Sequence, residues 1–420
     1  MHFLTKWLGA FALALTLTLG LFLSPAQAQS QQPIRIGLSV AQTGPLAGGG
    51  KSSLLAMQMW RDDVNAKGGL LGRKVELIAY DDQGVPANVP GLYTKLIDED
   101  KVDLLISPYG TDPIAAVLPL LKQRGILTIG NFGFDNNAKI QYDRYFQIAP
   151  WGQGADGWAN AFIEPGKKLG AKTIAFLAAN TEFSQTLVAG ARSLAKKEGL
   201  QVVYDQTYPA TTVDFSSMLR SLQATKPDLV FVASYPADSA ALVRSINEIG
   251  VGPSVKLLGG GMVGLQYPAA LQSLGPMLNG IVDYAHYVPE KTINFPGIRE
   301  FLERYAKRAA ADKIDPLGYY LAPFGYAEGQ LLEQAVTQTH SLDSRILANY
   351  LHTHEMKTIV GDIRFTATGE WATPRVFETQ FQGVRGNDLD QFRQPGKQVI
   401  IYPEQFKSGE VRSPFEKARQ

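Results

Sequence analysis

The 420-residue sequence contains no cysteine, and this absence excludes several kinds of chemistry at once. Without thiols the chain can form no disulfides, thiolate metal sites, iron–sulfur clusters or cysteine nucleophiles, and it carries no lipid attached to a cysteine. Net charge is scarce as well, because 40 Lys and Arg side chains stand against 39 Asp and Glu. This balance gives no electrostatic reason to expect nucleic acid or an anionic membrane as a partner.

Long apolar runs are also rare, and the longest one lies at the N-terminus. Lys6 precedes an apolar run from Leu8 to Leu23, and Ala26-Gln27-Ala28 fits the small-x-small pattern of a signal-peptide cleavage site. The run is shorter than the ~20 residues that a membrane-spanning helix needs, although an uncleaved anchor is the alternative. We therefore predict a signal peptide at residues 1–28 and a periplasmic protein without a membrane anchor. Its mature chain would have zero net charge.

The sequence as a whole has the composition of a globular protein, with 45% hydrophobic and 19% charged residues. Short apolar runs alternate with longer amphipathic stretches, which indicates strands connected by helices. The expected strands are 34–39, 74–81, 104–107, 126–130, 173–178, 201–208, 229–234, 255–258, 376–382 and 398–402. The expected helices are 92–99, 113–124, 186–198, 215–225, 237–249, 297–312, 323–339 and 344–352, with another around Met57, Trp60 and Val64. The rhythm restarts after Pro150, so the sequence predicts two α/β lobes, each with a doubly wound parallel sheet.

Two glycine-rich segments imitate nucleotide-binding loops, but neither pattern is complete. Residues 44–52 (GPLAGGGKS) have Pro45 where a P-loop needs glycine, and residues 259–264 (GGGMVG) are followed by Pro268 in the helix that should receive a pyrophosphate. A glycine turn that points backbone N–H groups at a ligand is the better interpretation of residues 44–52. A flexible glycine turn near a cleft is the simpler interpretation of residues 259–264.

The remaining signals for catalysis or metal binding are weak. His352-Thr353-His354 lacks a carboxylate at metal-ligand spacing, so a solvated helix end is the better interpretation. The sequence contains neither a G-x-S-x-G nor an H-E-x-x-H motif. We expect no enzyme, no catalytic residues, no metal and no cofactor.

Three segments carry a family resemblance. Residues 39–45 (SVAQTGP), 65–73 (NAKGGLLGR) and 80–82 (YDD) resemble the periplasmic solute-binding proteins of ABC importers of the leucine/isoleucine/valine type. The resemblance extends from about Pro33 to Gly369 and implies the type I clamshell fold, in which two α/β lobes are joined by three crossover segments. It places the crossovers near residues 148–150, 284–286 and 361–363. The lobes would then comprise 33–149 plus 286–360, and 150–285 plus 361–420.

The resemblance also implies which residues surround a ligand held between the lobes. The loops at the carboxyl ends of parallel strands are the expected place. There, Asp112 and Pro113 are expected to be the N-cap and first residue of a helix, which leaves Thr111 to bind a ligand carboxylate; the alternative is that Thr111 only shapes the turn. Tyr109 precedes this loop. The other expected contacts, some of which could be ordinary core residues, are Phe132, Phe134, Phe183, Tyr235, Leu46, Ala47, Gly261 and Met262.

The most informative difference from the family is a missing acid. Amino-acid binders of this type place an acid near the turn after the strand ending at Leu258, whereas residues 259–262 (GGGM) contain none. An ammonium buried without an anion costs roughly several kcal/mol, so an α-amino acid is disfavoured unless Asp238 or Asp283 reaches the ligand. Phenylalanines, a tyrosine and a glycine turn favour a flat aromatic ring.

The sequence thus predicts a protein that delivers a small hydrophobic carboxylate, such as a benzoate or cinnamate-type acid, to an ABC importer. Its partners would be that ligand and the importer's membrane subunits, and the protein would be a monomer. A binding protein for branched-chain or other hydrophobic amino acids is one alternative. A periplasmic ligand-sensor subunit is another, because the residues after Gly383 could form a docking surface.

Overall fold

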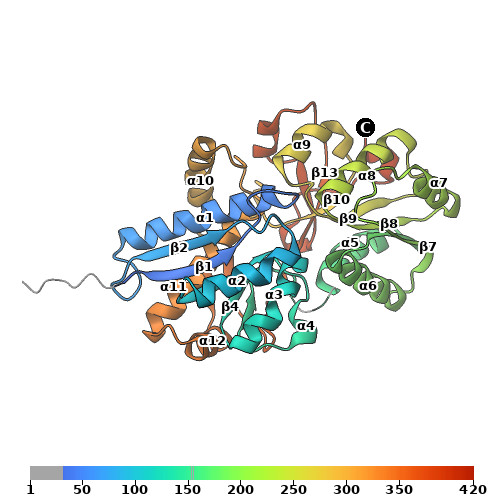
Figure 1. Cartoon of the computed structure of the whole chain (residues 1–420). Coiled ribbons are helices and arrows are strands. Elements are labelled where there is room, and N and C mark those ends of the chain that lie inside the picture. The colour runs from blue at the N-terminus through green and yellow to red at the C-terminus, as the bar shows by residue number, and fades with distance from the viewer. Residues whose placement is uncertain (1–31, 153, 155) are drawn as a thin grey trace, which may run out of the picture.

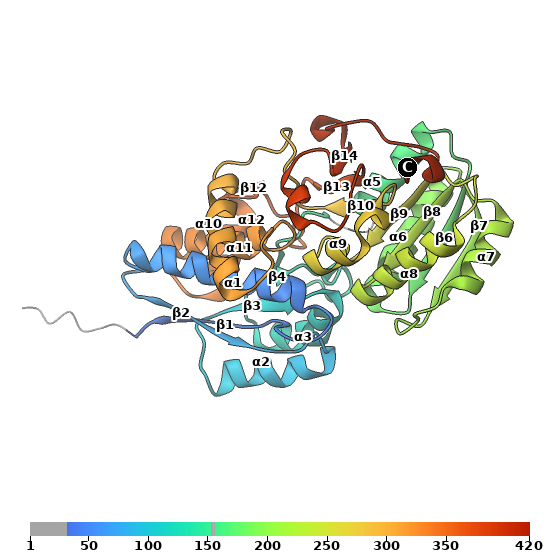
Figure 2. The same ribbon diagram turned by 90° about the horizontal axis from the view of Figure 1, so that it is seen from above.

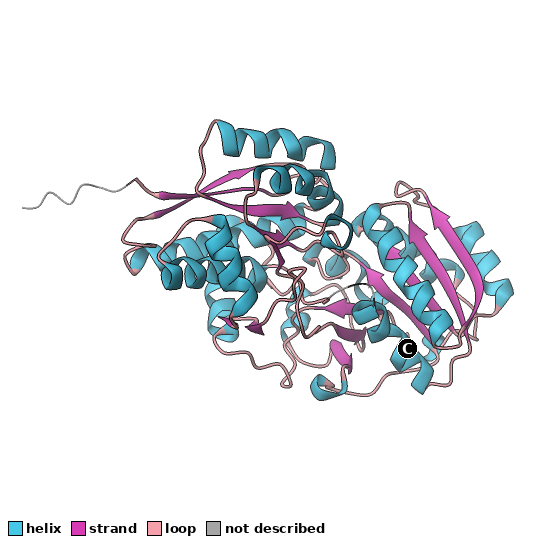
Figure 3. Ribbon diagram, turned by 90° about the horizontal axis from the view of Figure 1, so that it is seen from below, coloured by secondary structure: helices cyan, strands magenta, loops and turns pink. Residues whose placement is uncertain are grey.

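The computed structural model describes residues 32–152, 154 and 156–420. The chain forms two lobes, each built on its own sheet, which lie next to each other with the chain crossing between them (Figure 1). Helices cover both faces of the sheets (Figure 3). The predicted fold class, two doubly wound α/β lobes, is confirmed. The predicted signal peptide falls outside the described residues.

The first lobe contains a five-stranded parallel sheet in the order β2-β1-β3-β4-β5. Every residue of β3 is buried, as expected for a central strand covered on both faces. The strands are β1 (Ile34–Ser39), β2 (Val75–Tyr80), β3 (Leu104–Tyr109), β4 (Thr128–Asn131) and β5 (Tyr145–Gln147). The connecting helices are α1 (Ala47–Ala66), α2 (Val89–Asp98), α3 (Thr111–Arg124) and α4 (Asn137–Ile140).

The second lobe contains a seven-stranded sheet in the order β14-β13-β10-β9-β8-β6-β7. Five strands are parallel, and β13 and β14 are antiparallel at one edge. The strands are β6 (Thr173–Ala179), β7 (Gln201–Tyr208), β8 (Leu229–Ser234), β9 (Leu257–Met262), β10 (Val282–Ala285), β13 (Phe377–Phe381) and β14 (Gln398–Tyr402). The helices are α5 (Asp156–Lys168), α6 (Glu182–Lys197), α7 (Ser216–Thr225), α8 (Pro236–Ile249), α9 (Pro268–Leu274) and α13 (Phe415–Ala418).

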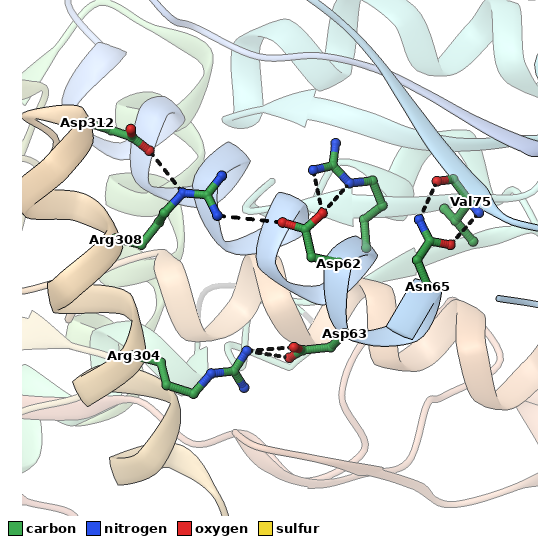
Figure 4. Close-up of polar contacts among 8 residues, drawn as sticks. Asp62, Asp63, Asn65, Val75, Arg304, Arg308 and Asp312 are labelled. Carbon is green, nitrogen blue, oxygen red and sulfur yellow. Dashed lines mark hydrogen bonds and ion pairs between the residues drawn. The ribbon is translucent and has the colours of Figure 1, made fainter. Parts of the chain in front are cut away.

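Three late helices return to the first lobe, where α10 and α11 pack against α1 (Figure 2). They are α10 (Ile298–Asp312), α11 (Ala322–Thr339) and α12 (Ser344–Thr353). Figure 4 shows the polar side of the contact between α1 and α10: Arg304 pairs with Asp63 at 2.6 Å, and Arg308 pairs with Asp62 at 3.6 Å. These pairs are partly exposed and contribute about 1 kcal/mol or less each, so the buried apolar faces carry most of the stability.

The segment 65–73, on which the resemblance rested, has a structural role. The Asn65 side chain exchanges two hydrogen bonds with the backbone of Val75, at 2.7 and 2.9 Å (Figure 4). Gly69 has a φ of +84°, and a Cβ there would lie 1.9 Å from the carbonyl oxygen of Arg73. The motif therefore fixes the turn that returns α1 to β2.

The third crossover lies later than predicted. The strands β11 (Met356–Thr358) and β12 (Gly361–Ile363) pair with each other, and the Gln147 N–H donates to the carbonyl of Gly369 at 2.8 Å, on the first lobe. The chain joins the second sheet only at β13. The division of the chain between the lobes stays a prediction, and these contacts favour moving its last boundary to residues 372–376.

The strand after residue 255 was predicted to end at Leu258 and to open into a glycine turn, and this prediction is wrong. β9 continues through Gly259, Gly260 and Gly261 to Met262. A Cβ on Gly259 would lie 1.8 Å from the carbonyl oxygen of Val282 on β10, and one on Gly261 would lie 2.6 Å from the Leu187 side chain on α6. The glycines allow close packing of a buried strand and do not form a turn.

Within the described residues, no helix is both long enough and apolar enough to cross a membrane. The C-terminal segment packs on the second lobe, where β14 pairs with β13 and the Phe415 N–H donates to the carbonyl of Val255 at 2.9 Å.

Candidate functional site

A cavity lies between the lobes, where the loops after the parallel strands of both sheets converge. Residues after β3 and β4 form one side, and residues from α6, from the start of α8 and after β9 form the other. Nine of its thirteen lining residues are aromatic. They are Leu46, Tyr109, Gly110, Thr111, Phe132, Phe134, Trp151, Trp158, Phe183, Tyr235, Val263, Tyr284 and Tyr320.

Thr111 is the main hydroxyl at the first-lobe side of the cavity. Gly110, with a φ of +101°, is the N-cap of α3, and Thr111 is the first residue of the helix. The Thr111 hydroxyl accepts a hydrogen bond from the Phe134 N–H at 3.0 Å, which leaves its own O–H free to donate. The prediction that Asp112 and Pro113 begin the helix is therefore wrong, because Gly110 alone supplies the backbone turn.

Asp112 instead connects the two lobes. Its carboxylate accepts hydrogen bonds from the backbone N–H groups of Glu182 at 3.0 Å and Phe183 at 3.4 Å, in the first turn of α6. It also accepts one from the Tyr235 hydroxyl at 2.6 Å. The partial positive charge of a helix N-terminus favours a carboxylate at this position. We call these three hydrogen bonds the Asp112 contact.

The aromatic side chains form two stacked pairs. The Trp151 and Trp158 rings stack at 4.5 Å between centroids, and the Phe183 and Tyr235 rings stack at 5.4 Å. The edge of Phe134 meets Trp158 at 5.5 Å. Both indole N–H groups are satisfied, since Trp151 donates to the carbonyl of Gly133 and Trp158 to that of Gly260, each at 2.7 Å. The rings therefore offer only apolar faces and edges to the cavity.

The cavity itself is small in this conformation, at about 20 Å³. This volume holds about one water molecule, whereas a cavity of about 150 Å³ accommodates benzene. The side chains named above thus nearly fill this part of the space between the lobes. A ligand of any size would require the lobes or a wall side chain to move.

Acids lie near the cavity, but none lines it among the described residues. Asp283 is buried and accepts hydrogen bonds from the Met262 N–H at 3.2 Å and from Gln266 at 2.7 Å. Asp238 accepts from the Tyr208 hydroxyl at 2.9 Å and from the Tyr235 N–H at 3.0 Å. Burial raises the pKa of Asp283 well above its ordinary value and that of Asp238 to about 6. Both carboxyl groups are therefore used inside the second lobe.

The comparisons with known proteins agree with this geometry. A family model described as "Periplasmic binding protein" matches residues 33–383. The chain belongs to the periplasmic binding protein family. This is a family of solute-binding proteins and not a family of enzymes, and the predicted resemblance is confirmed.

Individual relatives of this family are distant in sequence. Leu/Ile/Val-binding protein homolog 7 from Brucella abortus (strain 2308) is 25% identical over 395 residues, which cover 91% of this chain and 94% of the relative. The branched-chain amino acid transporter substrate binding protein LivJ from Streptococcus pneumoniae, in complex with isoleucine, is 19% identical with a TM-score of 0.72; the match covers 88% of this chain and 100% of LivJ. A solute binding protein of an ABC transporter from R. palustris, in complex with benzoate, is 22% identical with a TM-score of 0.71, covering 88% and 95%. The two structures show the shared fold.

Seven of the ten predicted site residues line the cavity, although their contact with a ligand stays a prediction. They are Leu46, Tyr109, Thr111, Phe132, Phe134, Phe183 and Tyr235. Gly261 and Met262 do not line it, because β9 buries them in the sheet and only the following Val263 reaches the cavity. Ala47 begins α1 and lies outside the cavity as well.

The sequence interpretation missed six lining residues: Gly110, Trp151, Trp158, Val263, Tyr284 and Tyr320. Trp151 directly follows the first predicted crossover and Tyr284 lies within the second, so their positions between the lobes were available as a signal. Neither Trp158 nor Tyr320 lies in or next to a recognised motif, so no local sequence pattern indicates that either residue lines the cavity.

The nucleotide-like segment at residues 44–52 is also part of this family's fold. The predicted strand-to-helix turn is confined to residues 44–46, because the three consecutive glycines lie in the first turns of α1. A Cβ on Gly50 would lie 2.0 Å from the carbonyl oxygen of Ala41, and one on Gly48 would lie 2.9 Å from the Tyr267 ring across the lobes. These glycines allow α1 to approach its neighbours closely.

The histidine pair at residues 352 and 354 does not form a metal site. His352 lies within α12 and its ring contacts the carbonyls of Asp143 and Thr366, at 2.8 and 3.2 Å. His354 is exposed and stacks on Tyr350. No cluster of three or more His, Cys, Asp or Glu side chains that could hold a metal ion occurs in the described part of the chain.

Proposed function

We propose that this periplasmic binding protein carries a small aromatic carboxylate and delivers it to an ABC importer by closing its lobes. The observation that supports this ligand class most strongly is the composition of the cavity. Nine aromatic side chains and the Thr111 hydroxyl surround the cavity, and no described carboxylate lines the wall. Aromatic faces and edges bind a flat ring favourably, and the Thr111 hydroxyl can donate a hydrogen bond to a carboxylate.

The closed arrangement supports the delivery part of the proposal. The Asp112 contact and the hydrogen bond between the Tyr109 and Tyr267 hydroxyls, at 2.9 Å, connect the lobes on either side of the cavity. A ligand held between the lobes would add to these contacts and shift the equilibrium toward the closed form. The export of the chain to the periplasm, a monomeric state and the importer's membrane subunits as partners belong to the same proposal.

A hydrophobic amino acid is the second candidate ligand, and Asp112 is the observation that favours it. Its carboxylate lies 2.6 Å from the Tyr235 hydroxyl, and Tyr235 lines the cavity. If Tyr235 turned away, this carboxylate could pair with a ligand ammonium. That exchange would break the Asp112 contact, so the aromatic acid is the better fit.

A thermal-shift screen of the purified protein tests the proposal, with benzoate, cinnamate, leucine, isoleucine, an amide and urea as separate ligands. A ligand present at 100 times its dissociation constant should stabilise the protein by about 2.7 kcal/mol. We expect this shift with the aromatic acids and not with the amino acids. Stabilisation by leucine or isoleucine alone would overturn the ligand class, and no response to any ligand would count against a binding function.

A further inference from the structure

His286 lies directly behind the aromatic wall of the cavity and has no hydrogen-bond partner. It follows β10 and is only 3% exposed. Neither ring nitrogen, Nδ1 or Nε2, has a partner among the described residues. A buried polar atom left unpaired costs about 1–3 kcal/mol, so this ring is a group that would gain from a hydrogen bond to a ligand.

The neighbours of His286 are the side chains that line the cavity. Its ring stacks on Tyr320 at 5.3 Å between centroids and meets the edge of Phe132 at 4.8 Å. Trp151 lies at 5.0 Å and Tyr284 at 5.4 Å. All four of these residues line the cavity. His286 therefore lies behind this wall. It does not line this cavity but a separate one of about 10 Å³, together with Gln266 and Gln398.

The ring that separates them is held by an unusual backbone. Phe132 has a φ of +61°, in the left-handed region that bulky side chains rarely adopt. Backbone strain of this kind is typical of ligand clamps and switch regions. Since the cavity of about 20 Å³ is too small for an aromatic ligand, the lobes or a wall side chain such as Phe132 have to move. A movement of Phe132 would both enlarge the cavity and uncover His286.

The charge state of His286 limits which ligand group it can receive. Burial, with a smaller effect from Arg375, lowers the pKa of His286 well below its ordinary value, so the ring is neutral. A neutral imidazole has one donor and one acceptor nitrogen. A hydroxyl can both donate and accept, so it satisfies whichever nitrogen faces it. An ionised carboxylate can only accept hydrogen bonds, so it cannot satisfy an acceptor nitrogen.

We infer that His286 is a specificity-determining residue that hydrogen-bonds a ring hydroxyl of the ligand, so that the protein prefers hydroxylated aromatic acids to unsubstituted ones. This inference rests on the proposed function, since it assumes an aromatic acid bound near Thr111. It adds a polar recognition group on the side of Phe132 and Tyr320, in addition to the Thr111 hydroxyl.

The test compares the affinities for 4-hydroxybenzoate and benzoate by calorimetry in the purified wild-type protein and in His286→Phe. Phenylalanine keeps a flat ring in the same aromatic packing but cannot form the hydrogen bond. We expect the wild type to bind 4-hydroxybenzoate about tenfold more tightly than benzoate, and H286F to bind both within about twofold of the wild-type benzoate affinity. The control H354F replaces an exposed histidine that stacks on Tyr350, and it should keep the tenfold preference.

A second measurement uses the wild type and does not depend on the folding of the variant. In protein labelled with ¹⁵N-histidine, 4-hydroxybenzoate should shift the ring-nitrogen resonances of one buried histidine, and benzoate should not. If both acids bind but the wild type shows no preference, or if H286F keeps it, the inference is wrong. If neither acid binds while isoleucine does, the proposed ligand class fails, and the role of His286 fails with it.

Discussion

The two sides of the cavity hold the lobes together by different physical means. On one side, Phe132, Trp151, Trp158 and Tyr320 form a dry aromatic wall whose contacts depend on burial and shape. On the other side, the Asp112 contact consists of three directional hydrogen bonds to a carboxylate that is only partly buried. The aromatic side should therefore govern stability and ligand shape, whereas the Asp112 side should govern how readily the lobes stay closed. The following predictions test this division.

The largest effect is expected from truncation of the aromatic wall. Trp158 is 1% exposed and packs against Trp151, Phe134 and Tyr284. Trp158→Ala should lower the free energy of unfolding by about 3–5 kcal/mol because it leaves a cavity and removes ring contacts. Urea unfolding measures this loss. The exposed Val213, replaced by alanine as a control, should change the free energy by no more than about 0.5 kcal/mol. A small loss for W158A would mean that the wall adds little to stability.

The next largest effect is a pH dependence of the unfolding free energy, caused by Asp238, whose carboxylate accepts a hydrogen bond from the Tyr235 N–H. Burial raises the pKa of Asp238 to about 6, above the value of 3.8 expected in the unfolded chain. The folded protein therefore holds this proton more tightly, and the resulting stabilisation is complete below about pH 4 and is lost as the pH rises through 6. Asp238→Asn removes this titration. Between pH 4 and pH 7, the wild type should lose on the order of 2 kcal/mol of unfolding free energy relative to D238N.

Urea unfolding of both proteins at pH 4, 5, 6 and 7 checks this difference, because other titrating groups such as Asp315 affect both proteins alike. A difference that stays constant over this range would contradict the raised pKa of Asp238.

A smaller effect, on affinity rather than stability, is expected at the Asp112 contact. Asp112→Asn keeps the size of the side chain but removes the charge that faces the first turn of α6. Because the group is partly exposed, the loss should be modest, at about five- to tenfold weaker binding of benzoate with little change in unfolding free energy. Calorimetry measures the affinity. The control D343N changes the N-cap residue of α12, far from the interlobe contact, and should leave the affinity unchanged. A loss of stability without a loss of affinity would reverse the proposed division.

The smallest effect should come from removing both hydroxyls of the Tyr109–Tyr267 pair. Tyr109→Phe alone leaves the buried hydroxyl of Tyr267 unpaired. It should therefore lower the free energy of unfolding by about 1–3 kcal/mol, or by less if water reaches that hydroxyl. The double variant Y109F/Y267F removes both groups and should return to within about 0.5 kcal/mol of the wild-type unfolding free energy. If the double variant is less stable than the single one, the pair contributes more than a matched hydrogen bond.

The fold was largely predictable because its signal is local and repeated. The alternation of apolar strands and amphipathic helices located every strand of five or more residues among the described residues, although it ended β9 too early, and segment 65–73 indicated the family. Elements with weak local signals were missed, including α5, which contains Pro165, and the four-residue strand β10. The third crossover was placed too early, because a short hairpin at residues 356–363 has no distinctive pattern.

The site was predictable only where it follows a strand end. Thr111, Phe132 and Tyr235 were found because the carboxyl ends of parallel strands meet at one edge of a sheet. The glycines at residues 259–261 were misinterpreted, since glycine marks a turn and a close backbone approach equally well in a sequence. Asp112 was taken for a helix cap because its partner residues lie 70 to 123 positions away in the chain.

The sequence by itself determined the order of strands and helices, the two α/β lobes and the exclusion of thiol chemistry, because composition and periodicity are properties of neighbouring residues. Only the tertiary structure decided which side chains face one another across the lobes. The burial of His286 without a partner, the positive φ of Phe132 and the connection of Asp112 to α6 all depend on contacts between segments that are distant in the chain. Such contacts produce no periodic pattern in the sequence, because each one needs only a single residue in each of the two segments.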